Sequence, residues 1–227
     1  GLEIIKKLAG HDYIIIATSR KKSSHVEELM NKSQKKIFFE ELDLSNTKNI
    51  RNFINMINEK YGKLYGLINN AAVGYDGILA TMHESEINET LRVNIEAPIL
   101  LSKYSSRMML LSGGGRIINI SSIIANTGFN GLSVYAASKS SLIGFTKSLS
   151  RELGKAKITV NAICPGYMQT EMTSGIDQIK LDQIKRRSPM KKLISPSDIT
   201  GIIIYLLSSD AQLITGATFT IDAGSTA

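Results

Sequence analysis

The chain has little of what builds disulfide-stabilised, fibrous or membrane-spanning proteins. Its 227 residues include one cysteine, four prolines and no tryptophan. A single cysteine excludes a disulfide framework and fits a reducing compartment, so we expect a cytoplasmic protein. Four prolines beside 18 glycines exclude collagen-like and proline-rich material. No stretch approaches the roughly 18 uncharged apolar residues of a membrane span, and no signal-peptide pattern opens the chain, so we expect no membrane partner.

Charge of one sign is in modest excess. Lys and Arg number 27 against 20 Asp and Glu, a net charge of +7. This balance permits a polyanionic partner, but the basic residues are scattered in pairs, such as Lys21-Lys22 and Arg186-Arg187, with no basic stripe. We therefore expect solvated faces and no nucleic-acid partner. A nucleic-acid-binding module stays as an alternative, which a steep salt-dependent affinity for DNA would support.

Metal-binding patterns are also missing. The three histidines show no metal-ligand spacing with one another or with Cys164, which predicts no metal site. Cys164 stands beside a proline at the end of an apolar run, and we interpret it as a small packing residue.

Short apolar runs alternate with helical patterns along the chain. Runs typical of buried strands occupy 13–17, 37–39, 64–68, 116–120, 158–163 and 218–221. Helical apolar spacing lies between them, over 2–8, 26–30, 50–57, 84–93, 94–111, 135–153 and 197–207. Buried strands alternating with helices predict an α/β fold, a doubly wound parallel sheet flanked by helices, as one domain over residues 1–227.

Small or polar residues follow nearly every predicted strand. The clusters are Thr18-Ser19-Arg20, Asp43-Leu44, Asn69-Asn70-Ala71-Ala72, Ser121-Ser122 and Pro165-Gly166. Ligands in doubly wound sheets bind outside the carboxyl ends of the strands. The sequence therefore predicts a binding site along this edge.

The first element of such a sheet is missing from the sequence. A dinucleotide-binding sheet normally begins with a strand and a glycine-rich turn, whereas this sequence enters directly at the following helix. The central first strand and the phosphate loop would need roughly 15–20 residues ahead of Gly1. We expect the sequence to be incomplete at its N-terminus.

Three polar residues are candidates for catalysis. Tyr135 and Lys139 are four apart on a predicted helix, so their Cβ atoms lie about 5–6 Å apart. A neighbouring ammonium favours the phenolate and is expected to lower the tyrosine pKa, which makes a usable general acid. Ser122 ends the predicted strand 116–120 and could donate to a carbonyl oxygen. Taken singly, the Tyr–Lys motif is more often a surface pair, and the serine is more often a hydroxyl that caps a turn.

A larger set of motifs is far more specific than any one of them. They are Asn69-Asn70-Ala71-Ala72, Val93-Asn94, Arg116–Ser122, Tyr135-Ala136-Ala137-Ser138-Lys139, Val160–Gly166 and Thr215-Gly216, in this order. This set resembles the short-chain dehydrogenase/reductase family, most closely its 3-oxoacyl-acyl-carrier-protein reductase branch, over essentially the whole chain. The resemblance implies a Rossmann-like fold and reduction of a ketone to a secondary alcohol.

The resemblance also implies a catalytic tetrad. Tyr135 would give its proton to the ketone oxygen as hydride reaches the carbon. Lys139 would lower the pKa of Tyr135 and hold the nicotinamide ribose. Ser122 would polarise the carbonyl. Asn94 would hold a water that links Lys139 to solvent.

Cofactor contacts follow from the same resemblance, at positions after the strands. Asp43 and Leu44 would meet the adenine; Asn70, Ala71 and Ala72 the adenosine side; and Pro165, Gly166, Met168 and Thr170, with Tyr135 and Lys139, the nicotinamide and its ribose. The family usually has glycine where Ala72 stands, which implies a small change in packing.

Ser19 and Arg20 indicate which cofactor is used. NAD-binding sheets usually carry an acidic residue at this strand end, which accepts from the ribose 2′-hydroxyl. Here a hydroxyl and a guanidinium stand there, and arginine suits a 2′-phosphate. We therefore predict NADPH/NADP+, with a solvated basic turn as the alternative.

The substrate is less determined. Residues 172–189 would form a substrate lid containing several basic residues, which suits an acidic carrier protein. Gly113-Gly114-Gly115 precedes the strand at 116–120, where carrier-protein reductases often have basic side chains. A ketone on acyl carrier protein, another small ketone, sugar or alcohol, and a catalytically inactive nucleotide-binding relative all remain open. Helices at 94–111 and 138–153 suggest a homotetramer or dimer, as is common in the family.

Overall fold

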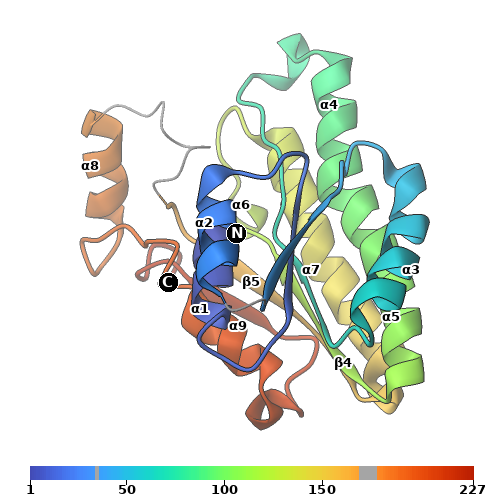
Figure 1. Cartoon of the computed structure of the whole chain (residues 1–227). Helices are drawn as coiled ribbons and strands as arrows, with labels where there is room; N and C mark the ends of the chain where they lie inside the picture. Colours follow the sequence, from blue (N-terminus) through green and yellow to red (C-terminus); the bar gives the residue numbers. More distant parts are fainter. Residues whose placement is uncertain (34–35, 169–177) are drawn as a thin grey trace.

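Two parallel sheets run through the protein, whose computed structural model describes residues 1–33, 36–168 and 178–227 (Figure 1). In the smaller sheet, β1 (Ile15–Ser19) pairs with β2 (Ile37–Glu41). The larger sheet has the order β3 (Gly66–Asn69), β4 (Gly115–Ile120), β5 (Ile158–Pro165) and β6 (Thr218–Ile221). Every neighbouring pair is parallel, as predicted from the uninterrupted apolar runs.

Helices cover both faces of the sheets. They are α1 (Leu2–Leu8), α2 (Ser24–Lys32), α3 (Ile50–Tyr61), α4 (Glu84–Leu91), α5 (Ala97–Ser112), α6 (Ile124–Thr127), α7 (Ser133–Leu153), α8 (Gln178–Arg187) and α9 (Thr200–Leu207). Figure 1 shows α3, α5 and α7 on one side and α1, α2 and α9 on the other. This arrangement confirms the doubly wound α/β fold.

The helical region between 84 and 112 differs from the prediction of two separate helices. A π-helical turn over Arg92–Glu96 joins α4 directly to α5. Pro98 closely follows this π-turn, where the change of hydrogen-bond pattern accommodates a residue without a backbone N–H. Single π-turns are frequent at functional sites, and this one contains Asn94.

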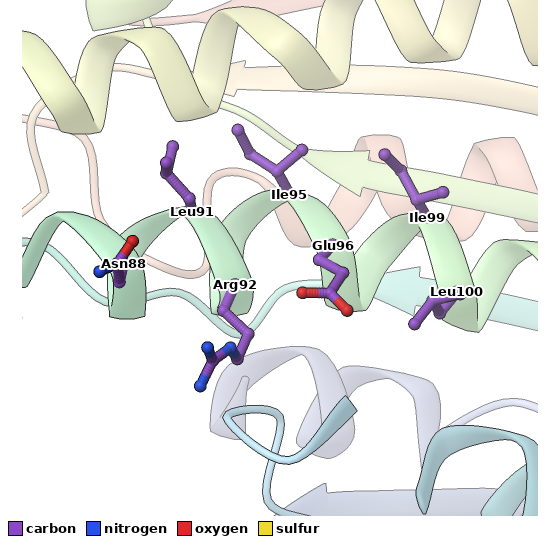
Figure 2. A pocket seen from close by; sticks show the side chains of 7 residues that line it. All are labelled: Asn88, Leu91, Arg92, Ile95, Glu96, Ile99 and Leu100. Carbon is purple, nitrogen blue, oxygen red and sulfur yellow. The ribbon is translucent and has the colours of Figure 1, made fainter. Parts of the chain in front are cut away.

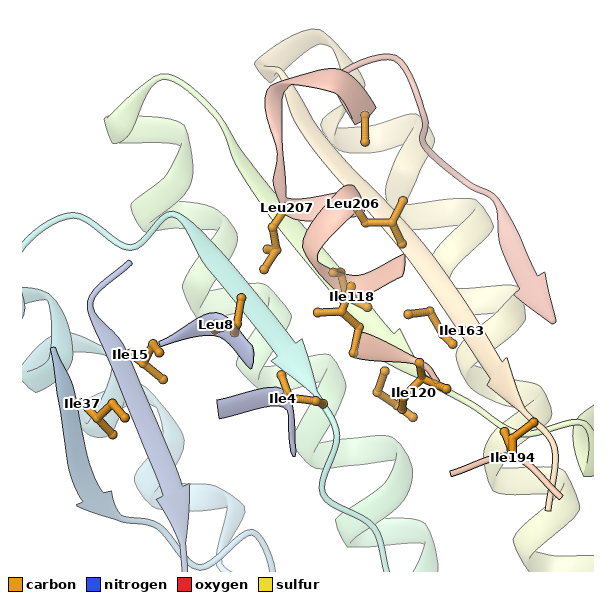
Figure 3. Close-up of a cluster of buried hydrophobic side chains, with 13 residues drawn as sticks. Ile4, Leu8, Ile15, Ile37, Ile118, Ile120, Ile163, Ile194, Leu206 and Leu207 are labelled. Atoms are coloured by element: carbon orange, nitrogen blue, oxygen red, sulfur yellow. The ribbon is translucent and has the colours of Figure 1, made fainter. Parts of the chain in front are cut away.

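β4 and β5 form the centre of the core, with every residue of both strands buried. Each presents side chains to both faces, so each needs an uninterrupted apolar run. Toward α9 and α1, Ile118 and Ile163 pack in one cluster with Ile4, Leu8 and Leu206 (Figure 3). Full burial of each such side chain contributes roughly 1.5–3 kcal/mol, so these strands are the main stabilising elements of the domain.

A glycine turn sets the start of β4. Gly113 and Gly114 have φ angles of +85° and +144° and connect α5 to the strand. At Gly115 a Cβ would lie 2.5 Å from Met109 Sδ. Glycine is required there because the helix packs directly on the strand backbone. The same three glycines leave this turn without basic side chains.

β1 and β3 belong to separate sheets. No described strand lies between them, and the strands of both sheets point the same way (Figure 3). A cavity of about 730 Å³ is lined by residues of both strands, including Ile16, Thr18, Leu67 and Ile68. The edges of β1 and β3 that face it pair with no other described strand.

Candidate active site

Helix α7 brings Tyr135 and Lys139 together near the end of β4. Lys139 Nζ lies 5.7 Å from the centre of the Tyr135 ring, and the lysine side chain is buried. Nζ donates to the carbonyl oxygen of Ile120 at 2.9 Å, and Ser121 Oγ donates to the carbonyl oxygen of Lys139 at 2.7 Å. These two hydrogen bonds fix the first turns of α7 against the end of β4.

Ser122 stands next to this junction, two residues beyond β4. Its Oγ accepts from the Ile124 N–H at 3.3 Å, where α6 begins, and Ile123 N–H donates to the Pro165 carbonyl at 3.0 Å. Within the described residues, the Ser122 hydroxyl donates no hydrogen bond and the Tyr135 hydroxyl makes none. Both hydroxyls can therefore bind a ligand at this sheet edge.

Burial dominates the electrostatics of the pair, and the expected lowering of the Tyr135 pKa is wrong for this state. Burial raises the pKa of Tyr135 to about 12. It lowers the pKa of Lys139 to about 8, opposed by the nearby Cys164. The ammonium lies over the ring and binds a backbone carbonyl, so it does not offset the desolvation of the phenol. Near neutral pH the phenol therefore keeps the proton that a general acid needs.

Asn94 is buried in the π-helical turn and connects two parts of the site. Its Oδ1 accepts from the Val73 N–H at 2.9 Å, and its Nδ2 donates to the Val73 carbonyl at 2.8 Å and to Ser138 Oγ at 3.0 Å. Ser138 in turn donates to the Tyr135 carbonyl at 2.7 Å. Asn94 therefore ties the loop after β3 to α7, and one acceptor position of Oδ1 remains for a water.

The ends of β1 and β2 carry the residues predicted to select the cofactor. Ser19 and Arg20 are exposed, and Ser19 Oγ donates to the Lys21 carbonyl at 2.7 Å. Hydrogen bonds from Ser45 lower the pKa of Asp43, and the charge of Arg20 adds to this effect. Arg20 and Asp43 therefore lie within electrostatic reach of each other, although 23 positions separate them in the sequence.

The remaining predicted contact residues lie at the other strand ends. Leu44, Asn70 and Ala72 are half-buried and Ala71 is exposed, whereas Pro165 is buried and Gly166 and Met168 are half-buried. A Cβ at Gly166 would lie 2.8 Å from Asp222 Cα, so the close approach after β6 requires glycine. Thr170 lies outside the described residues.

A polar network beneath the site was not found by sequence reasoning. Asn69 Nδ2 donates to Asn119 Oδ1 at 2.8 Å and to Ser102 Oγ at 3.2 Å, and Asn119 Nδ2 donates to Thr146 Oγ1 at 2.9 Å. Asn69 Oδ1 has no partner among the described residues, and Asn69 lines the cavity between β1 and β3. An asparagine inside each of two adjacent apolar strands was the signal that could have revealed it.

Two further predictions concern the surroundings of the site. Residues 172–177 of the predicted lid lie outside the described residues, and α8 begins at Gln178. On α8, Arg186 and Arg187 are exposed, and Lys185 pairs with Asp182 at 3.6 Å. Over the described ranges, no three His, Cys, Asp or Glu side chains converge to hold a metal, and no helix is long and apolar enough to cross a bilayer.

Known proteins match the chain over almost its whole length. A family model described as enoyl-(acyl carrier protein) reductase matches residues 1–226. The 3-oxoacyl-(acyl-carrier-protein) reductase FabG of Aquifex aeolicus is 33% identical over 99% of this chain and 92% of that protein. FabG of Escherichia coli is 31% identical over 99% of this chain and 91% of its own length. Both alignments therefore span the two sheets and the candidate tetrad.

Solved structures of similar proteins indicate the same family. A Serratia marcescens short-chain dehydrogenase/reductase mutant matches with a TM-score of 0.92 at 30% identity, covering 100% of this chain and 93% of that one. A blue fluorescent protein from a metagenomic library, in complex with NADPH, matches with a TM-score of 0.90 at 28% identity and the same coverage. The fold, the full-length family match and these relatives show that the chain belongs to the short-chain dehydrogenase/reductase family of oxidoreductases.

Proposed function

We propose that this protein uses NADPH to reduce the ketone of a 3-oxoacyl thioester carried on acyl carrier protein. The observation that carries the proposal is a protonated phenol, Tyr135, whose hydroxyl has no partner among the described residues. It lies beside Lys139, and Ser122 follows the strand to which Lys139 is bonded. A phenol and a serine hydroxyl at one sheet edge can bind the same carbonyl oxygen.

The residues present fit the proposed cofactor. Arg20 is exposed directly after β1, and its permanently charged guanidinium group suits a 2′-phosphate. Asp43 keeps Oδ2 free of the Ser45 hydrogen bonds, which both reach Oδ1. Asn70, Ala71, Gly166 and Met168 would line the rest of the cofactor. When bound, NADPH supplies the hydride.

Each member of the tetrad has a separate task in this proposal. Ser122 donates to the ketone oxygen and stabilises its developing negative charge. Tyr135 gives that oxygen its proton as a general acid. The Lys139 ammonium favours the phenolate left behind. Asn94 holds the loop after β3 against α7 and offers its remaining acceptor position to a water that returns a proton.

The names of the similar FabG proteins support the choice of substrate, and the exposed basic residues Arg186 and Arg187 of α8 suit an acidic carrier. The glycine turn at 113–115 offers no such charge. We therefore place the carrier-binding charge on α8. One buried free thiol, Cys164, also fits the reducing cytoplasm in which we place the enzyme.

The test is NADPH oxidation with acetoacetyl-acyl carrier protein, compared with acetoacetyl-N-acetylcysteamine, simple ketones and sugars. We expect the carrier-bound thioester to have the highest kcat/KM. A higher kcat/KM for a sugar or a free ketone would support the reductase activity but show that the proposed substrate is wrong. Tight NADPH binding with no turnover of any ketone would mean an inactive nucleotide-binding relative instead.

We also propose a homotetramer, or a dimer, built on the outer face of α4 and α5. This face has a groove of about 520 Å³ (Figure 2). Figure 2 shows Leu91, Ile95 and Ile99 along one side of the helix and Arg92 and Glu96 on another, so two copies could pair apolar with apolar and cation with anion. Light scattering on Ile99→Glu, which we expect to shift the protein toward smaller species, tests this assembly.

A further inference from the structure

An exposed apolar patch borders the candidate active site. Ile78 is 66% exposed, Leu79 is 55% exposed and Phe129 is 57% exposed. Ile78 and Leu79 lie in the loop between β3 and α4, and Phe129 lies between α6 and α7. Large apolar side chains exposed on neighbouring loops mark a binding site more often than isolated ones do.

Two contacts bring these separate loops together beside the catalytic phenol. Gly77 N–H donates to the Gly131 carbonyl at 3.0 Å, which joins the loop of Ile78 to the loop of Phe129. At Gly74 a Cβ would lie 3.1 Å from Tyr135 Cδ2, so the loop backbone packs directly on the tyrosine ring. Ile78 is therefore only four residues along the chain from Gly74, which packs on the Tyr135 ring.

The patch is held in place by local structure. Leu79 begins a short 3₁₀ turn, in which Thr81 Oγ1 donates to the Ile78 carbonyl at 3.2 Å. Phe129 begins a second turn, closed by the hydrogen bond from Leu132 N–H to the Phe129 carbonyl at 3.1 Å. Exposed apolar side chains on two fixed turns form a preorganised surface, which loses little conformational freedom on binding.

We propose that Ile78, Leu79 and Phe129 form a shelf that binds the apolar tail of the substrate and sets the preferred chain length. This inference rests on the proposed function. A tail attached to a ketone at Tyr135 can leave the site past the loop that packs on that ring. Ile78 and Leu79 stand on this loop, and Phe129 stands on the loop that is hydrogen-bonded to it. All three side chains are hydrocarbon, so the ligand that they suit is a hydrocarbon chain rather than a polar group.

The test compares kcat/KM for acetoacetyl, 3-oxooctanoyl and 3-oxododecanoyl N-acetylcysteamine thioesters. For the parent protein we expect kcat/KM to rise with chain length, by up to roughly threefold for each methylene that contacts the shelf. Ile78→Ser, Leu79→Ser and Phe129→Ser should each lower the value for 3-oxododecanoyl about tenfold and leave acetoacetyl unchanged. Leu213→Ser is the matched control, because Leu213 is 91% exposed and lies in the loop before β6.

Two results would overturn the shelf: equal values across the chain lengths in the parent protein, or equal losses on short and long substrates in the variants. Direct binding separates this inference from the proposed function. Calorimetry with dodecanoyl-N-acetylcysteamine should show weaker binding to Phe129→Ser than to the parent protein. If this weaker binding were found but no ketone were turned over, the shelf would be supported and the proposed reductase activity would be wrong.

Discussion

The two sheets of this protein are built in different ways. β4 and β5 are buried along their whole length, and the candidate catalytic residues are tied to their ends by Lys139 Nζ–Ile120 O and Ser121 Oγ–Lys139 O hydrogen bonds. β1 pairs with one strand, borders a cavity of about 730 Å³ and ends in the exposed Ser19 and Arg20. The proposed function thus places the chemistry at the larger, buried sheet and cofactor selection at an exposed strand end.

This difference should separate effects on activity from effects on stability. The buried core fixes the positions of the candidate catalytic side chains at the end of β4, whereas Arg20 is exposed and can be replaced with little effect on packing.

Tyr135→Phe should show the largest effect. We expect kcat to fall about 10³-fold, since proton transfer by a positioned acid contributes roughly 10²–10⁴-fold. The free energy of unfolding should stay within about 0.5 kcal/mol, because no described residue accepts a hydrogen bond from this hydroxyl. NADPH oxidation and urea unfolding measure the two quantities.

Tyr65→Phe is the matched control. The Tyr65 hydroxyl donates to the Leu207 carbonyl at 2.5 Å, at the opposite end of β3 from Asn69. Its loss should destabilise the protein by about 1 kcal/mol and leave kcat unchanged. If Tyr65→Phe lowered kcat as far as Tyr135→Phe, the two tyrosines would not differ in role and the assignment of the general acid would be wrong.

Truncating the core should affect the two sheets unequally. Ile118 in β4 is 1% exposed and packs in the cluster toward α9 and α1, so Ile118→Ala should cost about 3–4 kcal/mol. Ile15 in β1 borders the cavity, where neighbours have space to relax, and Ile15→Ala should cost about 1–2 kcal/mol. Urea midpoints at constant m-value give both numbers. Equal costs would show that the smaller sheet is packed as firmly as the larger one.

The fold was predictable from the sequence because buried parallel strands need uninterrupted apolar runs. Runs such as 116–120 and 158–163 have few other uses in a soluble chain, and the helices between them have regular apolar spacing. The continuous passage from α4 to α5 was not predictable, since a π-turn adds one residue per turn without a clear signal in composition. Strand ends shifted by one or two residues for the same lack of a local signal.

The candidate site was predictable in its members but not in its electrostatics. The spacing of Tyr135 and Lys139 gives their shared helix face, whereas their burial depends on β4, β5 and the loop after β3. That burial reverses the expected direction of the Tyr135 pKa. The hydrogen bonds of Asn94 to Val73 and Ser138 could not be predicted either, because they join residues 21 and 44 positions away.

Cofactor preference should change with one residue of the smaller sheet. Arg20→Glu should lower the ratio of kcat/KM for NADPH to that for NADH about 30-fold, since a carboxylate repels a 2′-phosphate and accepts from a 2′-hydroxyl. Stability should stay within about 0.5 kcal/mol, because Arg20 is exposed. Lys21→Glu changes the local charge equally and should alter the ratio by less than about threefold. A similar change in both variants would indicate a general field rather than a specific guanidinium contact.

Lys139 should also make the free energy of unfolding and kcat/KM depend on pH. Its pKa is lowered to about 8 from an ordinary value of 10.5, chiefly by burial. Between these values the unfolded chain holds a proton that the folded chain has lost, so the unfolding free energy rises with pH across this window. Below pH 8 both states are protonated and the cost of the buried charge is fully present. The rise should appear as a difference between the parent protein and Lys139→Met, in which Tyr135 is retained.

Activity should move in the opposite direction over the same range. Once the Lys139 ammonium loses its proton above about pH 8, nothing in the pair favours the phenolate that forms as Tyr135 gives up its proton. kcat/KM for ketone reduction should therefore fall above that pH while stability rises. Urea unfolding and initial rates from pH 7 to about 10 measure both curves on one sample. If the stability difference stays flat across this window, Lys139 does not carry a buried charge in the folded protein. The end of β4 would then not differ from the end of β1 in the burial of a charge.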